Sequence, residues 1–309
     1  MVPSPHIAVR IDLGQVRRNV QVIRSVVGVP LMAVIKADAY GLGAAPVATA
    51  IADLVDGFCV FGLAEAVEAQ LLRRTGKHAL ALGPDADPTA DDYIAQGVRP
   101  AVWDERRASL LRRAHPVLSV DTGMQRFSCP PEQIDRVLKA GECTEAFTHA
   151  ISLDRVERLL AMVGNRGLKL HAAGSSLMHE AAARLDCVRP GIALYRGAAR
   201  IHARLADERK SSGPAGYGGF STPRHGVILG GYSNGLRVGP CVINGRRSRV
   251  LEVGMQSSFV ETTESDRVGD EVVLLGEGLQ ETDVAAAWKS SPHEALTRLC
   301  GAGVRRYIE

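Results

Sequence analysis

Apolar, β-branched runs alternate with helical patterns through the first 195 residues, and this alternation limits what the chain can fold into. Helical stretches with apolar spacings of three and four separate most of the runs and are long enough to act as crossover helices. A strand and a helix repeated eight times are typical of a (β/α)8 barrel. The expected strands are residues 31–36, 57–63, 79–83, 99–103, 117–121, 146–150, 168–172 and 188–194, and the expected helices include residues 64–74, 105–113, 131–139, 155–163 and 176–185.

The alternation stops after Tyr195, where a polar, Gly-rich passage at residues 211–219 predicts a loop. Short strands without crossover helices follow it, which indicates a mostly β domain. These strands are expected at residues 225–229, 241–243, 249–253, 258–262, 271–275 and 304–308, with short helices at 284–289 and 292–300. The fold class is therefore α/β + β, with an N-terminal (β/α)8 TIM barrel over residues 1–200 and a C-terminal mostly β domain over residues 201–309.

Composition excludes several classes of function. The chain has 309 residues, a formal net charge of +3 and no clustered basic stretch, so no nucleic-acid partner is expected. No segment has the pattern of a signal peptide or a membrane span. The 6 cysteines form no CxxC pair and no metal-ligand spacing, which predicts reduced interior thiols, a cytoplasmic location and no metal site.

Lys36 ends the first apolar run and is followed by Ala37-Asp38-Ala39-Tyr40-Gly41. A lysine that emerges from a buried strand is desolvated, so its pKa falls and its amine can attack carbonyl groups. The alternative is a lysine that ends a strand and simply reaches water. The pattern around Lys36 does not by itself decide between the two.

Other polar residues lie at or just beyond the predicted carboxyl ends of later strands, which is the catalytic face of a TIM barrel. Each alone has a structural explanation, such as a core histidine, a surface ion pair or a turn serine. Together with Lys36 they supply an amine, an imidazole that can stack on a ring, a guanidinium and phosphate ligands, a combination that indicates a pyridoxal 5'-phosphate (PLP) pocket. The residues are Arg126, His149, Ser175, Arg189 and Gly191.

Six motifs resemble, in order, those of the alanine racemase family of barrel-type, fold type III PLP enzymes. They are residues 33–41, 120–126, 148–149, 171–175, 188–195 and 231–235. The resemblance covers essentially the whole chain. It implies a PLP-dependent amino-acid racemase that interconverts L- and D-alanine by a two-base mechanism and works as a homodimer with shared active sites.

The resemblance also implies a role for individual residues. Lys36 holds the cofactor covalently and is one acid/base, and Tyr232 is the other, contributed across the dimer interface. Arg189 meets the pyridine nitrogen and His149 lies against the ring, while Arg126 and the backbone of Met255 hold the substrate carboxylate. The residues implied to hold the cofactor phosphate are Tyr40, Ser175, Gly191, Ile192 and Tyr307.

Three residues depart from the family pattern. Ser119 stands where a lysine is frequent, Gly174 where an asparagine is usual, and Gln256 where an aspartate follows the methionine. A racemase or epimerase of another amino acid therefore stays open as an alternative. A PLP-dependent decarboxylase lacks its glycine-rich phosphate loop here, and a non-catalytic PLP-binding protein would not need Tyr232 or a β domain.

Overall fold

The computed structural model describes residues 6–164 and 166–309, and the chain divides into two compact units. The barrel unit comprises Val16–Ala39 and Gly43–Tyr195. The β unit comprises Met1–Gln15, Tyr40–Leu42 and Arg196–Glu309. Both units draw on separate stretches of the chain, and the single boundary after residue 200 stays a prediction.

The barrel unit contains a parallel sheet whose strands follow one another in chain order. Residues 187–190 connect its two edges: Val188 bridges Leu31 at one edge and Cys187 bridges His171 at the other. The eighth run is thus extended only at its start, because Ile192–Leu194 forms a 3-10 turn, η4. The parallel α/β barrel architecture is confirmed. Its strands are β2 (Met32–Val34), β3 (Gly57–Val60), β4 (Ala79–Ala81), β5 (Val98–Val102), β6 (Val117–Ser119), β7 (Glu145–Ala150) and β8 (Lys169–Ala173).

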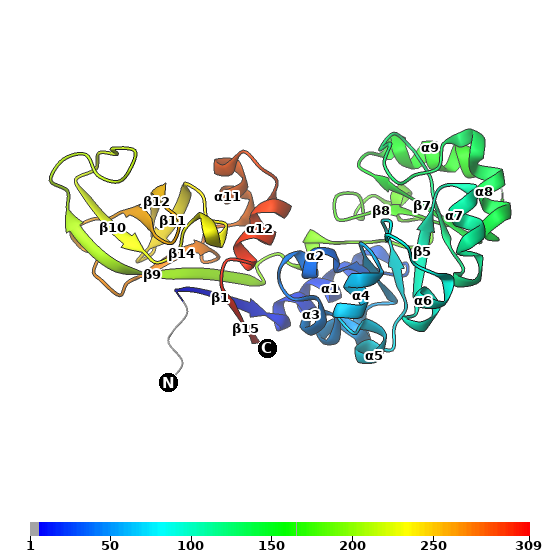
Figure 1. The fold of residues 1–309 in the computed structure, drawn as a ribbon, viewed down its shortest axis with the longest axis horizontal. Coiled ribbons are helices and arrows are strands. Elements are labelled where there is room, and N and C mark those ends of the chain that lie inside the picture. Colours follow the sequence, from blue (N-terminus) through cyan, green and yellow to red (C-terminus); the bar gives the residue numbers. More distant parts are fainter. Residues whose placement is uncertain (1–5, 165) are drawn as a thin grey trace. The chain divides into compact units, whose positions relative to one another are not determined.

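Helices cover the outside of the barrel strands (Figure 1). Their apolar residues recur every three or four positions, as in α1, which buries Val16, Val20 and Ile23. The helices are α1 (Leu13–Val27), α3 (Ala44–Ile51), α4 (Leu63–Glu68), α5 (Leu71–Thr75), α6 (Ala90–Ala95), α7 (Glu105–Leu110), α8 (Ile134–Gly141), α9 (Leu153–Val163) and α10 (Ala181–Arg184). Short 3-10 turns are η1 (Ala52–Leu54), η2 (Arg112–Ala114) and η3 (Pro131–Gln133).

The β unit is built around β9 (Ala199–Lys210), which pairs with β10, β14 and β1. The ladder β9-β10-β13-β12-β11-β14 returns to β9 and closes a barrel, from which β1 and β15 extend. The other elements are β1 (Ile7–Asp12), β10 (Arg224–Ile228), η5 (Tyr232–Asn234), β11 (Gly239–Ile243), β12 (Arg246–Val253), β13 (Ser258–Glu261), β14 (Glu271–Leu275), α11 (Glu281–Trp288), α12 (Pro292–Cys300) and β15 (Val304–Ile308).

Strands β1 and β9 were not among the expected elements. In β1 the buried residues Ile7, Val9 and Ile11 alternate with more exposed ones, which is the pattern of a strand with one covered face. The expected helix at 64–74 is interrupted because Gln70 adopts a left-handed conformation with φ of 49°. No described helix has the length and apolar character needed to cross a membrane.

Replacing Tyr195 with Phe tests the packing that fixes β2. The Tyr195 hydroxyl donates to the Val34 carbonyl oxygen at 2.7 Å, and Tyr195 is 0% and Val34 6% exposed. Without the hydroxyl, the buried Val34 carbonyl oxygen loses its hydrogen-bond donor. We therefore expect Tyr195→Phe to lower the free energy of unfolding by about 1–3 kcal/mol. Urea unfolding measures this, with Tyr217→Phe at a 91% exposed position as the control. Equal midpoints for the two variants would contradict the assignment.

Candidate active site

Lys36 follows β2 and begins an unusual turn, α2 (Lys36–Tyr40). Ala37, Asp38 and Ala39 all have φ between 52° and 54°, in the left-handed region that residues with a Cβ avoid. Side chains brace the turn, since Glu65 accepts from the Ala37 N–H at 2.8 Å and Asp38 accepts from the Ala44 N–H at 2.7 Å. The strained turn therefore fixes the backbone directly after Lys36.

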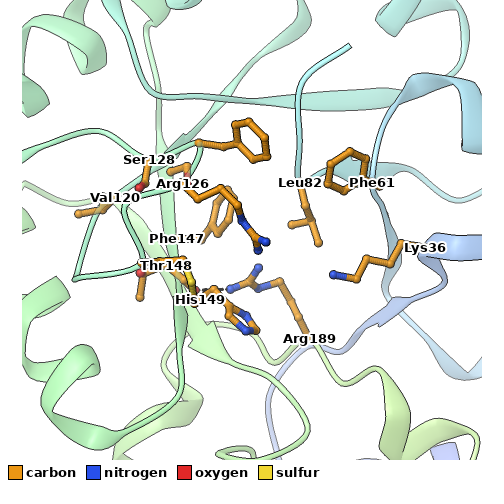
Figure 2. A pocket seen from close by; sticks show the side chains of 13 residues that line it. Lys36, Phe61, Leu82, Val120, Arg126, Ser128, Phe147, Thr148, His149 and Arg189 are labelled. Atoms are coloured by element: carbon orange, nitrogen blue, oxygen red, sulfur yellow. Dashed lines mark hydrogen bonds between the residues drawn. The ribbon is translucent and has the colours of Figure 1, made fainter. Parts of the chain in front are cut away.

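One pocket in the barrel unit gathers four of the expected residues: Lys36, Arg126, His149 and Arg189. Figure 2 shows Lys36 entering from one side, with the two guanidinium groups and the imidazole converging on the same space. The remaining lining residues include no aspartate and no glutamate. They are Phe61, Leu82, Ser119, Val120, Met124, Phe127, Ser128, Phe147 and Thr148. Three cationic side chains thus share a pocket whose wall carries no anion.

The Arg189 guanidinium is buried, with the residue only 6% exposed. Its Nη2 donates to the Thr148 carbonyl oxygen at 2.5 Å, while its Nε is buried and has no hydrogen-bond partner among the described residues. Its central carbon lies 4.7 Å from the centre of the Phe147 ring. Because a buried cation needs compensation, an Arg189 left with an unused donor indicates a ligand that accepts a hydrogen bond.

The Phe147 ring is packed against His171, which in turn contacts Glu145. The His171 ring stacks on Phe147 with centroids 5.4 Å apart and planes 8° apart, and His171 Nε2 lies 2.9 Å from Glu145 Oε1. Although burial opposes ionisation, hydrogen bonds from His171 and Arg99 lower the pKa of Glu145 to about 2. Phe147 and Glu145 were not predicted as site residues, since their role depends on contacts between strands.

The charge state of the pocket favours neutral bases. Burial, with the nearby Arg189, Lys36 and Arg126 charges, lowers the pKa of His149 to about 4. Burial and the Arg126 charge also lower the pKa of Lys36. The excess of positive charge therefore favours a neutral His149 imidazole. It also makes the Lys36 ammonium easier to deprotonate than it would be in water.

Arg126 lies in the loop after β6, between two residues in left-handed conformations, Gln125 with φ of 53° and Phe127 with φ of 49°. These conformations turn the backbone sharply on both sides of Arg126, so that its side chain points into the pocket (Figure 2). The neighbouring Ser119 ends β6 and is 6% exposed. The loop geometry, rather than an acidic partner in the pocket wall, directs the Arg126 guanidinium.

Ser175 meets the turn at residues 191–193, which contains Gly191 and Ile192, at a second point of the barrel unit. The N–H groups of Gly191 and Ala193 both donate to Ser175 Oγ, at 2.9 and 3.2 Å. Backbone N–H groups that converge on one oxygen atom are an arrangement that also suits an anion. A Cβ at the neighbouring Gly174 would lie 3.6 Å from the Arg189 carbonyl oxygen, an ordinary contact, so the space does not require glycine there.

The other expected residues belong to the β unit. Tyr232 is 57% and Met255 60% exposed, and their backbones are tied together because Ser233 Oγ donates to the Met255 carbonyl oxygen at 2.7 Å. A Cβ at Gly231 would lie 2.2 Å from the Gly254 carbonyl oxygen, so only glycine fits before Tyr232. Gln256 is exposed beside Met255.

Two further tyrosines expected at the cofactor phosphate are also in the β unit. The Tyr40 ring is buried and lies 5.7 Å from the His293 ring, and Tyr307, on β15, is 38% exposed. The expected site residues are therefore divided between the two units, with Tyr40, Tyr232, Met255 and Tyr307 in the β unit.

Comparisons with known proteins agree on one family over both units. The N-terminal domain model of alanine racemase matches residues 11–199, and the C-terminal domain model matches residues 210–308. An alanine racemase of Neisseria meningitidis is 30% identical, over 94% of this chain and 96% of the relative. The crystal structure of alanine racemase from Streptomyces lavendulae has a TM-score of 0.90 at 23% identity, covering 100% of this chain and 98% of the other. A Bartonella henselae alanine racemase structure, described as having covalently bound pyridoxal phosphate, has a TM-score of 0.86 at 23% identity and covers 99% and 100%.

The titration of His149 tests the electrostatics of the pocket. We expect NMR of the imidazole to show a pKa of about 4 instead of the ordinary 6.5. Since the folded chain then binds fewer protons at this residue than the unfolded chain, its contribution to stability is full above 6.5 and falls as the pH drops towards 4. His149→Asn should reduce that loss. A pKa near 6.5 in the folded protein would show that neither burial nor the cations act on His149.

Proposed function

The chain belongs to the alanine racemase family of isomerases, and from that premise we propose that it interconverts L- and D-alanine with PLP as its cofactor. One observation carries the proposal: the pocket holds Lys36 beside a buried Arg189 whose Nε has no partner among the described residues. A pyridine nitrogen is an acceptor that this donor can satisfy, and a lysine amine can bind the aldehyde of the same cofactor.

The residues present fit PLP. Lys36 would hold it covalently, Arg189 would donate to its ring nitrogen and His149 would lie against its ring. Ser175 with the backbone N–H groups of Gly191 and Ile192 would take the phosphate, supported by the convergence of the Gly191 and Ala193 N–H groups on Ser175 Oγ. Tyr40 and Tyr307 would complete the phosphate ligands. The Bartonella henselae relative, described with covalently bound pyridoxal phosphate, supports this assignment.

Bound PLP supplies an electron sink that makes the Cα proton of an attached amino acid acidic. The protein then has to remove that proton on one face and return one on the other, which requires two acid/base groups. Lys36, whose pKa burial lowers, serves one face, and Tyr232 serves the other. Arg126 holds the substrate carboxylate with the backbone of Met255, since a guanidinium pairs well with a carboxylate.

Arg189 also explains why racemisation is favoured over decarboxylation or transamination. Burial lowers the pKa of Arg189, yet an arginine in a protein keeps its proton and acts only as a donor. Beside such a donor a bound ring nitrogen would stay unprotonated, and the electron sink would be weaker than beside an acid. The weaker sink would restrain competing reactions such as transamination.

We further propose a homodimer in which each site takes Tyr232 and Met255 from the partner. Both residues are more than half exposed, and the hydroxyl of Ser233, the residue after Tyr232, donates to the Met255 carbonyl oxygen. Exposed tyrosine and methionine side chains are typical of surfaces that a protein partner covers. A second copy of this chain would bury Tyr232 and Met255.

Racemisation of another amino acid is the second candidate, favoured by Ser119 in the pocket wall where a longer side chain is frequent in the family. A racemisation screen over all L-amino acids separates the two candidates, with the highest kcat/KM identifying the substrate. The six buried, unpaired thiols support a cytoplasmic location.

The covalent role of Lys36 gives the first functional prediction. Borohydride treatment of the purified, PLP-loaded protein should leave a pyridoxyl group on Lys36, found by peptide mapping. Lys36→Ala should lose both the label and turnover, while Lys139→Ala on the surface helix α8 should keep both. A pyridoxyl group on any other lysine would refute the assignment.

The requirement for two acid/base groups gives the second functional prediction. Tyr232→Phe should slow conversion of L- to D-alanine by about 10²-fold or more, because general acid/base groups contribute on that scale. In deuterated water, any Cα exchange that remains should retain the L configuration, since Lys36 acts on one face alone. Racemisation at the wild-type rate would mean that another group acts on the second face.

Mixing the two inactive variants tests the shared site. A mixed dimer of Lys36→Ala and Tyr232→Phe has one doubly damaged site and one intact site, so random exchange should restore roughly a quarter of wild-type sites. Mass spectrometry verifies the exchange. If activity stays at the level of the separate variants, the lysine and tyrosine of one site come from the same chain.

A further inference from the structure

A hollow of about 250 Å³ lies on one face of the β unit, over strands β1, β9 and β15. Its lining includes the small residue Ala8 and three arginines, Arg10, Arg204 and Arg306. His202 also lines it. Every lining residue belongs to the β unit, whereas the pocket of Lys36 is lined by the barrel unit alone, so the two are different sites.

The strand register places positively charged arginines directly opposite one another on this face. Arg10 on β1 is directly opposite Arg306 on β15 and directly opposite Arg200 on β9. Residues paired in this way project from the same side of a sheet, and like charges at directly opposed positions destabilise it. Three arginines in one row therefore need compensating negative charge.

The carboxylates of the β unit compensate only part of the row. Arg200 is paired with Glu271 at 2.6 Å and Glu277 at 2.8 Å. Glu271 is shared further with Arg204, at 3.4 Å. Arg10 and Arg306 are both exposed and have no carboxylate partner within the part of the chain that the structure describes.

His202 provides a second observation that points to a ligand in the hollow. It is only 5% exposed, and its Nε2 lies 3.3 Å from Glu271 Oε1. Its Nδ1 is buried without a hydrogen-bond partner among residues 6–164 and 166–309. A ring nitrogen buried without a partner loses its hydrogen bonds to water and gains none in the protein, which is unfavourable. A ligand in the hollow would supply the hydrogen bond.

We propose that this hollow is a binding site for a small phosphate-bearing anion. Arg10 and Arg306 form charge-assisted hydrogen bonds to the phosphate oxygens, because the guanidinium fork matches phosphate geometry and each dianion balances two uncompensated charges. His202 Nδ1 accepts from a protonated phosphate oxygen or, once protonated, donates to an unprotonated one. The volume admits inorganic phosphate or a small monoester.

Calorimetric titration of the PLP-loaded protein with inorganic phosphate tests the proposal, at ionic strength held constant with chloride. We expect one site per chain beyond the cofactor site, a similar response to sulfate and a much weaker one to acetate. Arg10→Gln combined with Arg306→Gln should weaken phosphate binding at least about tenfold, since charged hydrogen bonds are lost. Racemase turnover of the double variant verifies that it is folded.

A matched control separates a site from general attraction. Arg209→Gln combined with Arg247→Gln removes the same charge from exposed positions of the β unit outside the hollow, and should leave phosphate affinity unchanged. Equal losses in the two double variants, or wild-type affinity no greater for phosphate than for acetate, would overturn the proposal. A change of oligomeric mass in Arg10→Gln/Arg306→Gln without phosphate binding by the wild type would also overturn it, showing that a second copy covers the face. Arg306→Gln alone, at the edge strand, keeps the test available if the double variant does not fold.

Discussion

The Arg189 guanidinium lies buried against the Phe147 ring, donates to one backbone carbonyl and leaves its Nε without a partner among the described residues. Burying a cation this way is costly unless something accepts its remaining hydrogen bond. Burial and this charge lower the pKa of His149, and burial and the Arg126 charge lower that of Lys36. The pocket therefore offers Arg189 Nε as a donor to a ligand that can accept a hydrogen bond. The proposed cofactor, with an unprotonated ring nitrogen, would supply that acceptor and bind the Lys36 amine.

The barrel itself sets the distance between the two key side chains. Arg189 belongs to the segment that closes the sheet, where its N–H donates to the Ala173 carbonyl oxygen at 2.8 Å. One residue further, the Pro190 carbonyl oxygen accepts from the Val34 N–H at 2.9 Å, two positions before Lys36. The hydrogen bonds that complete the barrel therefore also fix Arg189 relative to Lys36. This arrangement links the stability of the fold to the geometry of the site.

Sequence patterns predicted the parallel barrel, most of the strands after Tyr195 and the gathering of Lys36, Arg126, His149 and Arg189. These features depend on periodicity and on strand ends, which are local. Patterns did not predict the left-handed turn after Lys36, because no glycine marks it and side chains such as Glu65, distant in sequence, hold it. They also missed the support of Arg189 by Phe147, since it depends on strands brought together only in the fold. Which residue is left without a partner is likewise a property of the packed structure.

The central claim is that Arg189 donates a hydrogen bond to an unprotonated ring nitrogen of PLP. Nitrogen-15 NMR of the protein loaded with PLP labelled at that nitrogen measures this directly. The account predicts the chemical shift of a neutral pyridine that accepts a hydrogen bond, and a change of shift in Arg189→Gln. The shift of a protonated pyridinium in the wild-type protein would contradict it.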